Sequence, residues 1–339
     1  MRSILVTGGA GFIGSHYLNH MLAAHPDYRA IVLDKLTYAG NKQYLCEAAH
    51  AAPERLEFVR GDLAEEGFAQ WLLDEYQCDL VVHFAAESHV ERSLETPMLF
   101  WKSNADGSAF LLEAARLKKV KRFLLVSSVE VYGPQAEDAA PWREDDVIRP
   151  PTPYAAAKAS AEQWAFAYWK SYGLPTVITR SSNNYGPRQH AEKQLPALIT
   201  AALHNAPLPV HGDGRHLRQW LYVEDHCRAL DLILHADERL VAGEIFNVGG
   251  GPQAERTTLQ NAQAVLERLD SRSQIAFLPD RVPSIRRLAL DSTRLEQRLG
   301  WKPQVSFEEG LEHTLAFYTG GRRPPPAAAD NRSLLLTQI

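Results

Sequence analysis

Short apolar runs alternate with longer amphipathic segments through the first two thirds of the chain. The apolar runs are Ile4–Val6, Ile31–Leu33, Leu56–Val59, Leu80–Phe84, Phe123–Val126 and Thr176–Thr179. The amphipathic segments between them are Gly14–Ala24, Phe68–Glu75, Leu99–Leu117 and Tyr154–Tyr172. Strands that alternate with helices form right-handed βαβ units, and uninterrupted apolar runs are typical of strands covered on both faces. The pattern predicts an α/β fold with a doubly wound parallel sheet.

The sequence pattern changes after about Gly186, where apolar runs shorten and proline and glycine become more frequent. This change predicts a smaller lobe of helices and short strands over the carboxyl edge of the sheet. The segments Leu221–Ala236 and Ile245–Val248 are an expected helix and strand that can return to the main sheet, so the two parts interleave. The predicted division is a main domain at 1–186 completed by parts of 221–250, a smaller C-terminal lobe mainly at 187–320, and a flexible tail at 321–339.

Composition places the chain among ordinary globular proteins. Hydrophobic residues make up 45% and charged residues 23% of its 339 residues, which excludes a disordered or fibrous chain. The net charge of −5 gives no sign of the basic face that nucleic-acid binding requires. No apolar stretch is long enough to span a membrane. We therefore expect neither nucleic acid nor a membrane as a partner.

The cysteines and the N-terminus bear on the compartment. Cys46, Cys78 and Cys227 are odd in number and far apart, which gives neither a disulfide framework nor a metal spacing. The apolar run before the first glycines is too short for the core of a signal peptide. We expect a cytoplasmic protein without a metal site.

A glycine-rich turn follows the first apolar run directly. Gly8, Gly11 and Gly14 are spaced where a strand passes into a helix, and Asp34 ends the next strand. Such glycines let the backbone approach a pyrophosphate at a helix N-terminus, and an acid at the second strand end accepts the hydroxyls of an adenosine ribose. An acid at that place also repels the 2′-phosphate of NADP. The pattern predicts a Rossmann-type domain that binds NAD.

Two further strand ends extend the predicted cofactor site. Asp62 follows the third apolar run, where its carboxylate can accept the adenine amino group or begin a helix as a turn residue. Phe84, Ala85 and Ala86 close the fourth run, and small residues there let a cofactor lie flat over the sheet edge. Together these positions predict a cofactor that follows the carboxyl edge of the sheet.

Candidate catalytic chemistry lies on the predicted helix that begins after Pro153. Tyr154 and Lys158 are four residues apart and therefore share one face of that helix. A lysine ammonium and a positive nicotinamide ring beside a phenol favour the phenolate, so a tyrosine of ordinary pKa about 10 can act as a base near neutral pH. Ser128 ends the preceding strand and supplies a hydroxyl for the same substrate oxygen. These residues predict a base assisted by a lysine and a serine.

Five segments give the chain a resemblance to a known family. They are Thr7–Gly14, Asp34–Asn41, Ala85–Ser93, Ser182–Pro187 and Trp220–His226. With the Tyr-x-x-x-Lys pair they resemble the extended short-chain dehydrogenase/reductases, and more narrowly the dTDP-glucose 4,6-dehydratases. The resemblance covers about residues 1–318.

The resemblance implies a reaction that passes through a 4-keto sugar. Tyr154 would take the proton of the sugar C4 hydroxyl while hydride passes to NAD, and Glu130 would remove the C5 proton that the new ketone acidifies. Lys193, Arg218 and Arg287 match family positions near a nucleotide diphosphate, where cations suit two phosphates. The implied function is an NAD-dependent nucleotide-sugar dehydratase that eliminates water across C5 and C6.

The complete predicted site has three parts. The predicted catalytic residues are Ser128, Glu130, Tyr154 and Lys158. The residues predicted to bind the cofactor are Gly8, Gly11, Phe12, Ile13, Gly14, Asp34, Lys35, Asp62, Leu63, Phe84, Ala85, Ala86, Ser88, Asn104, Tyr154 and Lys158. The residues predicted to bind the nucleotide sugar are Ser88, His89, Asn183, Lys193, Pro209, His211, Arg218 and Arg287.

One catalytic position departs from the family pattern. The 4,6-dehydratases carry an aspartic acid immediately before the glutamate, where it protonates the departing C6 hydroxyl, and this chain has Val129. Loss of a general acid typically costs on the order of 10²–10⁴-fold in rate. In addition, Ser284 and Ile285 replace a His-Asp pair, and His211 stands where the family tends to place a tyrosine. These departures weigh against a simple transfer of the family's reaction.

Three reactions remain open on the same tyrosine, lysine and NAD core. Elimination persists if Glu130 or a bound water supplies the proton. A nucleotide-sugar 4-epimerase needs no acid at position 129. It leaves C5 unchanged, however, so Glu130 would have no catalytic role in it. A UDP-glucuronate decarboxylase is the third, since valine in place of aspartate removes a like-charge repulsion with a C6 carboxylate. Elimination is favoured over epimerisation, and a nucleotide-sensing regulator is the non-enzymatic alternative.

The expected assembly also follows from the resemblance. The helices at Leu99–Leu117 and Tyr154–Tyr172 are similar to those that pair across dimers in this family. The resemblance therefore implies a homodimer.

Overall fold

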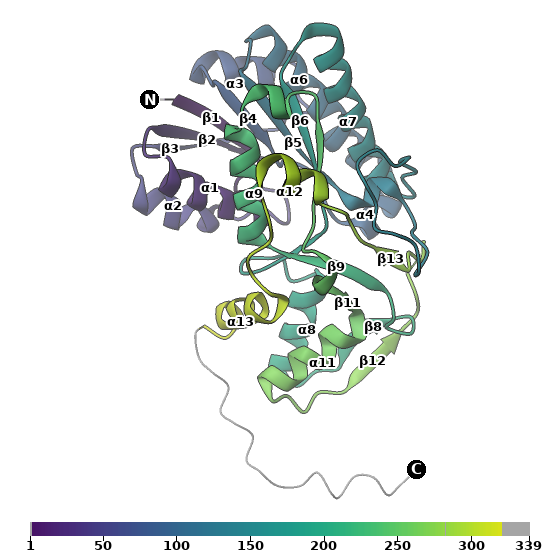
Figure 1. Ribbon diagram of the computed structural model, residues 1–339. Coiled ribbons are helices and arrows are strands. Elements are labelled where there is room, and N and C mark those ends of the chain that lie inside the picture. The colour runs from purple at the N-terminus through teal and green to yellow at the C-terminus, as the bar shows by residue number, and fades with distance from the viewer. Residues whose placement is uncertain (1, 282, 321–339) are drawn as a thin grey trace, which may run out of the picture.

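Seven parallel strands form the central sheet of the chain. The computed structural model describes residues 2–281 and 283–320 (Figure 1), and the tail predicted at 321–339 lies outside them. The strands run in the order β10-β6-β5-β4-β1-β2-β3. Their bounds are β1 (Arg2–Thr7), β2 (Tyr28–Asp34), β3 (Leu56–Arg60), β4 (Leu80–His83), β5 (Arg122–Ser128), β6 (Thr176–Ser181) and β10 (Ile245–Val248). All six apolar runs form strands of this Rossmann-like sheet, as predicted.

Helices cover both faces of the sheet, which is why its strands read as continuous apolar runs. One face packs against α1 (Phe12–Ala24), α2 (Cys46–Ala51), α9 (Val223–His235) and α12 (Thr293–Leu299). The other face packs against α3 (Phe68–Tyr76), α6 (Gly107–Leu117) and α7 (Pro153–Tyr172), which lie side by side in Figure 1. Each face buries its own cluster of apolar side chains, so the sheet is a rigid platform for the loops at its edge.

The strand order places a crevice at the carboxyl edge of the sheet. The chain adds strands outward from β1 to β2 and β3, then returns to place β4 on the other side of β1. Loops on the two sides of such a reversal diverge, and ligands of open α/β sheets bind in the gap. The candidate residues Asp34 and Ser128 end β2 and β5 at this edge.

Two predicted helices have different bounds in the structure. The segment predicted as one helix at Leu99–Leu117 consists of α5 (Pro97–Phe100), a π-helical stretch η2 (Trp101–Asp106) and α6. The helix predicted at Leu221–Ala236 begins only at Val223, because Leu221 and Tyr222 complete β9 (Leu217–Tyr222). Apolar periodicity alone does not distinguish a π turn from an α turn, nor the end of a strand from the start of a helix.

The smaller lobe is built around two short sheets. Strand β9 pairs with β7 (Asn183–Tyr185), β11 (Glu255–Thr257) and β13 (Arg287–Leu288), while β8 (Leu208–His211) pairs with β12 (Ile275–Leu278). The helices α8 (Gln194–Leu203), α11 (Thr258–Leu269) and α13 (Phe307–Tyr318) pack on them and bury a third apolar cluster. Figure 1 shows this lobe below the main sheet. Strand β10 lies between β9 and β11 in the sequence and returns to the main sheet, where it pairs with β6.

Short elements connect these layers. They are η1 (Lys42–Leu45), α4 (Val90–Glu95), η3 (Val129–Tyr132), α10 (Glu238–Val241) and η4 (Pro252–Ala254). Within the described part of the chain, no helix combines the length and the apolar character needed to cross a bilayer.

Candidate active site

A cavity of about 370 Å³ opens at the carboxyl edge of the sheet, between the main sheet and the smaller lobe. All four predicted catalytic residues line it, and so do fifteen of the sixteen residues predicted to bind the cofactor, with Asn104 as the exception. Of the residues predicted to bind the sugar nucleotide, Ser88, Asn183 and Lys193 line it. The fold therefore gathers residues from eight segments of the sequence around one space.

The glycine-rich turn forms one wall of this cavity by close backbone contact. Gly8 has a φ of +69°, and a Cβ at this position would lie 2.6 Å from the backbone nitrogen of Ala85. A Cβ on Gly14 would lie 2.4 Å from the carbonyl oxygen of Gly8. Only glycine fits at both positions, so the turn sits directly beside the loop after β4. The first backbone N–H groups of α1 consequently face the cavity, where they suit an anion.

Asp34 is held at the end of β2 by the backbone of its neighbours. Its carboxylate accepts a hydrogen bond from the Ala10 N–H at 3.0 Å and another from the Leu36 N–H at 2.8 Å. Burial raises the pKa of Asp34, and these two hydrogen bonds oppose the shift. The carboxylate thus lines the cavity beside the glycine turn in a fixed orientation, as a ribose acceptor requires.

Asp62 combines the two roles that the sequence left open. Its carboxylate lines the cavity and also accepts a hydrogen bond from the Ala64 N–H at 3.0 Å, as a turn aspartate does. Lys35 approaches the same carboxylate at 2.6 Å. Burial acts against these partners, but together they hold the pKa of Asp62 below its usual value. Lys35 is therefore drawn toward Asp62.

Asn104 supports the cavity wall rather than lining the cavity. Its side-chain oxygen accepts from the Glu87 N–H at 2.8 Å, and its amide donates to the Glu87 carbonyl at 2.9 Å. Both backbone polar groups of Glu87, in the loop after β4, are thereby satisfied. The π-helical stretch η2 carries Asn104 to this position, and such stretches are frequent at functional sites. In this structure Asn104 positions the loop, and its contact with the cofactor stays a prediction.

The polar atoms left over in this half of the cavity fit a dinucleotide. The hydroxyls of Ser127 and Ser182 are buried and have no hydrogen-bond partner among the described residues. Buried polar groups are rarely left without a partner, so these atoms are suited to a polar ligand. With the glycine turn at one end and Asp34 beside it, the residues fit NAD.

Tyr154 is the candidate base on the opposite wall. It lies in the first turn of α7, which Thr152 caps by accepting from the Ala155 N–H at 3.2 Å. Burial raises the pKa of Tyr154 to about 12, a hydrogen bond with the Ser128 side chain opposes the shift, and the charge of Glu130 adds to it. The phenol and the serine hydroxyl are thus adjacent, as predicted, and able to share one substrate oxygen.

Lys158 is anchored at the end of β5. Its ammonium donates a hydrogen bond to the Val126 carbonyl at 2.6 Å. Burial lowers the pKa of Lys158 to about 8, with the charge of Glu162 acting in the opposite sense. The lysine lines the same cavity as Tyr154, and its action on the pKa of the phenol stays a prediction.

Glu130 is a buried carboxylate with one oxygen free. Burial raises its pKa, and the charges of Arg218 and Lys193 lower it. Its Oε2 atom has no hydrogen-bond partner among the described residues. A carboxyl group whose pKa is raised toward neutrality in a cavity is suited to move a proton.

Val129 replaces the expected acid with an apolar surface. It is 2% exposed and packs in a cluster with Ile285, Leu288 and Leu290. It also lines the cavity. Both Val129 and Ile285 stand where the family resemblance places aspartates, so the two departures from the family pattern meet in one apolar cluster.

The remaining substrate residues lie at different distances from the cavity. Lys193 donates to the Ser88 carbonyl at 2.9 Å and joins the two lobes. Arg218 on β9 is half-buried, and its charge lowers the pKa of Glu130. His89 caps α4, while Pro209 and His211 lie on β8. None of these last four residues is among those that line the cavity.

Arg287, which the resemblance assigns to the diphosphate, is held by an ion pair in this structure. Its guanidinium is paired with Glu255 at 2.7 and 2.8 Å and also contacts the Ala139 carbonyl. Arg281 is a second arginine in this segment. It is paired with Glu91 at 2.8 Å, and its charge lowers the pKa of both Lys193 and Arg218. Neither arginine is among the residues that line the cavity.

Comparisons with known proteins agree with this geometry. A protein-family model described as GDP-mannose 4,6 dehydratase matches residues 5–314. The chain is 43% identical to a dTDP-glucose 4,6-dehydratase of Actinoplanes over 94% of this chain and 98% of that one. It is similar to the structure of a Streptomyces venezuelae dTDP-glucose 4,6-dehydratase with NAD bound, with 42% identity, a TM-score of 0.88 and coverage of 94% and 98%. It also resembles a Thermotoga maritima UDP-glucose 4-epimerase, with 30% identity, a TM-score of 0.86 and coverage of 94% and 99%.

Proposed function

The chain belongs to the GDP-mannose 4,6-dehydratase family, and from this premise we propose that it is an NAD-dependent nucleotide-sugar 4,6-dehydratase. The single observation that carries the proposal is the position of Glu130. It is a buried carboxylate with a raised pKa and a free oxygen, in the same cavity as Tyr154. Chemistry confined to C4 has no use for such a group, whereas elimination across C5 and C6 requires it.

Tyr154 and Ser128 begin the reaction. When bound, oxidised NAD supplies a hydride acceptor for C4 and a positive charge beside the phenol. The Ser128 hydroxyl and the Tyr154 side chain converge on the C4 oxygen, and the Tyr154 phenolate removes its proton. Burial holds the pKa of free Tyr154 at about 12, so the tyrosine reaches its basic form only when positive charge is brought close. This couples proton removal to the presence of the cofactor.

Glu130 carries the elimination. The ketone at C4 acidifies the C5 proton, and the free Oε2 of Glu130 accepts it. The protonated carboxyl then returns this proton to the C6 hydroxyl, which leaves as water. One group acts as base and acid in turn, so the elimination balances without an acid at position 129 and leaves a 4-keto-5,6-ene. The hydride taken from C4 then returns to C6 and a solvent-derived proton is added at C5, which gives a 4-keto-6-deoxy sugar and restores oxidised NAD. The raised pKa favours both halves of this cycle, because Glu130 holds the proton long enough to deliver it.

A second candidate, a nucleotide-sugar 4-epimerase, is favoured by one observation. Val129 presents a methyl-lined wall to the cavity where the dehydratases carry their acid. An epimerase needs Tyr154 and NAD but no proton donor at C6. Relatives with this activity share the fold at similar TM-scores.

Incubation with NAD and a panel of dTDP-, UDP- and GDP-hexoses and hexuronates separates these activities. Loss of one water by mass, with a 4-keto product in the NMR spectrum, is the expected result. An unchanged mass with a new sugar spectrum means epimerisation, and loss of carbon dioxide means decarboxylation. Either of these results would replace the proposed reaction, and no turnover or binding of any sugar would remove the proposed substrate class.

We also propose that the chain acts as a homodimer in the cytoplasm. The helices α4 to α7 expose large apolar side chains at 44–71% of their surface, namely Leu94, Met98, Leu99, Trp101, Leu117, Trp164, Phe166 and Tyr172. A patch of this kind favours association. The cysteines Cys46, Cys78 and Cys227 are free thiols, which suits a reducing compartment. Light scattering on a size-exclusion column should give twice the chain mass, and Trp164→Glu should give the monomer.

A further inference from the structure

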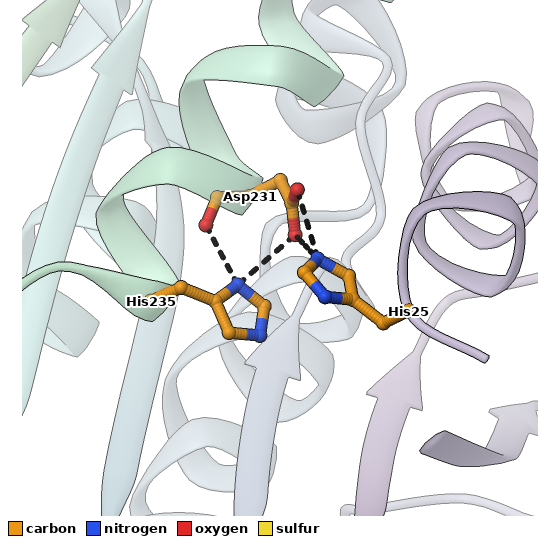
Figure 2. Close-up of side chains that lie close together, drawn as sticks. All are labelled: His25, Asp231 and His235. Atoms are coloured by element: carbon orange, nitrogen blue, oxygen red, sulfur yellow. Dashed lines mark hydrogen bonds and ion pairs between the residues drawn. The ribbon is translucent and has the colours of Figure 1, made fainter. Parts of the chain in front are cut away.

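A cluster of histidines around Asp231 lies outside the active-site cavity. His25 ends α1, while Asp231 and His235 are four residues apart on α9 and share one face of that helix. Asp231 Oδ1 lies 2.9 Å from His25 Nε2 and 3.1 Å from His235 Nδ1. Figure 2 shows both imidazoles directed at this carboxylate. None of the three residues lines the cavity that contains Tyr154.

The geometry points to a site for a divalent transition metal, and we propose that His25, Asp231 and His235 bind Zn²⁺. Their three candidate ligand atoms all lie within 4.8 Å of one another. Zinc takes histidine nitrogen and carboxylate oxygen at about 2.0–2.2 Å, which places tetrahedral ligand atoms about 3.4 Å apart. The separations from the carboxylate oxygen to the two nitrogens fall just short of this value. His235 Nδ1 also contacts the Asp231 carbonyl at 2.9 Å, and His25 Nε2 contacts Asp231 Oδ2 at 3.1 Å, so the metal replaces these hydrogen bonds as the side chains rotate. Two histidines and one carboxylate also form a common ligand set for zinc with an open fourth position.

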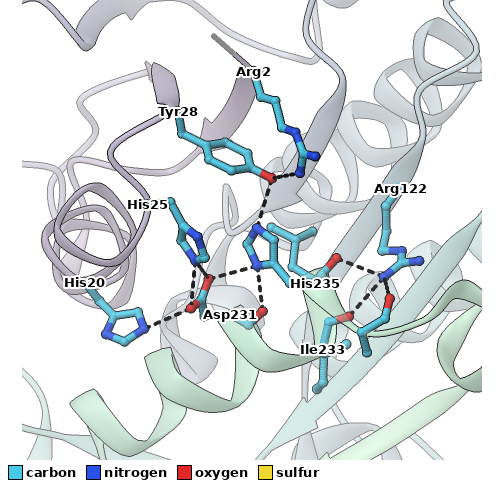
Figure 3. A network of polar contacts seen from close by, with 10 residues as sticks. Arg2, His20, His25, Tyr28, Arg122, Asp231, Ile233 and His235 are labelled. Carbon is cyan, nitrogen blue, oxygen red and sulfur yellow. Dashed lines mark hydrogen bonds and ion pairs between the residues drawn. The ribbon is translucent and has the colours of Figure 1, made fainter.

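Neighbouring residues hold the ligands in orientation. His20 Nε2 lies 3.2 Å from Asp231 Oδ2, the oxygen that faces away from His235. Tyr28 Oη lies 3.0 Å from His235 Nε2, and this hydroxyl accepts a hydrogen bond from Arg2 at 3.2 Å. Figure 3 shows these contacts as one network. Outer partners on the second ring nitrogen and the second carboxylate oxygen orient metal ligands and tune their affinity.

The cluster joins two helices that are distant in sequence, since His25 caps α1 while Asp231 and His235 lie on α9. The rings of His25 and His235 are stacked with their centroids 4.2 Å apart, although the residues are far apart in sequence. Side-chain exposures of 24%, 15% and 23% for His25, Asp231 and His235 leave room for an ion to enter. A metal at this position ties the C-terminal end of α1 to α9. Because α1 begins at the glycine-rich turn, the metal holds the opposite end of the helix whose first residues line the cofactor cavity.

Titration of the untagged full-length protein with Zn²⁺ tests the site. The protein is first treated with a chelator, freed of it, and kept at about pH 8, where free imidazoles are neutral. We expect one equivalent of Zn²⁺ per chain and a higher melting temperature with the metal. Co²⁺ in place of Zn²⁺ should give the visible absorption of a four-coordinate nitrogen and oxygen site.

Two variants and a matched control locate the binding. His25→Gln and Asp231→Asn should each weaken Zn²⁺ affinity at least about tenfold and abolish the metal-dependent rise in melting temperature. His204→Gln should change neither, because His204 Nδ1 contacts only a helix carbonyl of α8, Thr200 O at 2.8 Å. Far-UV circular dichroism confirms that each variant is folded. The proposal is overturned if the wild type binds less than half an equivalent, or if His25→Gln and Asp231→Asn bind as tightly as His204→Gln.

Discussion

The two sides of the cavity are built in different ways. On the cofactor side, residues that are neighbours in sequence hold one another, as when Asp34 accepts from the Leu36 N–H at 2.8 Å. On the sugar side, Glu130 from the main domain faces Lys193 and Arg218 from the smaller lobe. Backbone geometry organises the first side, whereas charges from distant segments organise the second.

This difference separates what is shared in the family from what is particular to this chain. The cofactor side tolerates few substitutions, because a Cβ on Gly8 or Gly14 would collide with backbone atoms. The sugar side is set by side chains, and there the chain carries Val129 and Ile285 in place of polar residues. Substitutions on the tyrosine and glutamate should therefore separate oxidation at C4 from elimination at C5 and C6.

The largest effect is expected for Tyr154→Phe. Tyr154→Phe removes the group placed at the C4 oxygen, so kcat should fall on the order of 10³-fold and no reduced cofactor should form with substrate. Tyr168→Phe is the matched control and should keep normal turnover, because Tyr168 lies near the other end of α7 and its hydroxyl donates to Glu113 of α6 at 3.0 Å. Normal turnover of Tyr154→Phe would remove the assignment of the base.

The next largest effect should follow Glu130→Gln. Elimination should slow about 10²-fold, while oxidation at C4 continues because Tyr154 and Ser128 are intact. Stopped-flow absorbance should then show reduced cofactor that forms and persists. Equal loss of both steps would mean that Glu130 acts on binding or folding rather than on the C5 proton.

Sequence reasoning located most of the cofactor side and less of the sugar side. Gly8, Asp34 and Tyr154 stand at strand ends or helix starts, and their spacing along the chain is enough to place them at one edge. The ion pair of Arg287 with Glu255 joins β13 to β11 and depends on strand pairing that no periodicity marks. The contact of Asn104 with the Glu87 backbone likewise joins two separate segments, so no pattern along the chain indicates it. The His25–Asp231 contact also joins distant segments and carries no local signal.

A smaller effect, in the opposite direction, is expected for Val129→Asp. An acid beside the C6 hydroxyl should raise the elimination rate about tenfold. Burying a polar group in the apolar cluster should also lower the free energy of unfolding by about 1–3 kcal/mol. Val129→Asn should show the stability loss without the rate gain. If Val129→Asp eliminates water no faster than wild type, the cavity is adapted to a reaction that needs no acid there.

The two arginines near β13 allow a sharper test of the sugar side. Arg281→Ala should raise KM for the nucleotide sugar about tenfold, as loss of one charge-assisted contact to phosphate does. Arg287→Ala should leave KM within about twofold, but leaving Glu255 without its partner should lower the free energy of unfolding by about 1–3 kcal/mol. Steady-state kinetics and urea unfolding of both variants distinguish the roles, and the reverse pattern would assign Arg287 to the diphosphate.

The smallest expected effect is a shift in the pH profile. Burial raises the pKa of Glu130, and Arg218 and Lys193 limit the rise. Glu130 must be ionised to accept the C5 proton, so kcat should fall as pH drops through this raised pKa, above the ordinary value of a glutamate. Removing one cation by Arg218→Met should move this acid limb to still higher pH. An acid limb that stays in place would mean that another group controls it.

Turnover in heavy water tests the central claim, that this chain eliminates water through Glu130 without an acid at position 129. The product is examined by mass and by NMR after reaction of dTDP-, UDP- or GDP-hexose, whichever is turned over. The account predicts a product that has lost water and carries deuterium at C5, because the original C5 proton leaves through Glu130 and C5 is reprotonated from solvent when hydride returns to C6. A product of unchanged sugar composition with no deuterium at C5 would contradict it and leave only chemistry at C4.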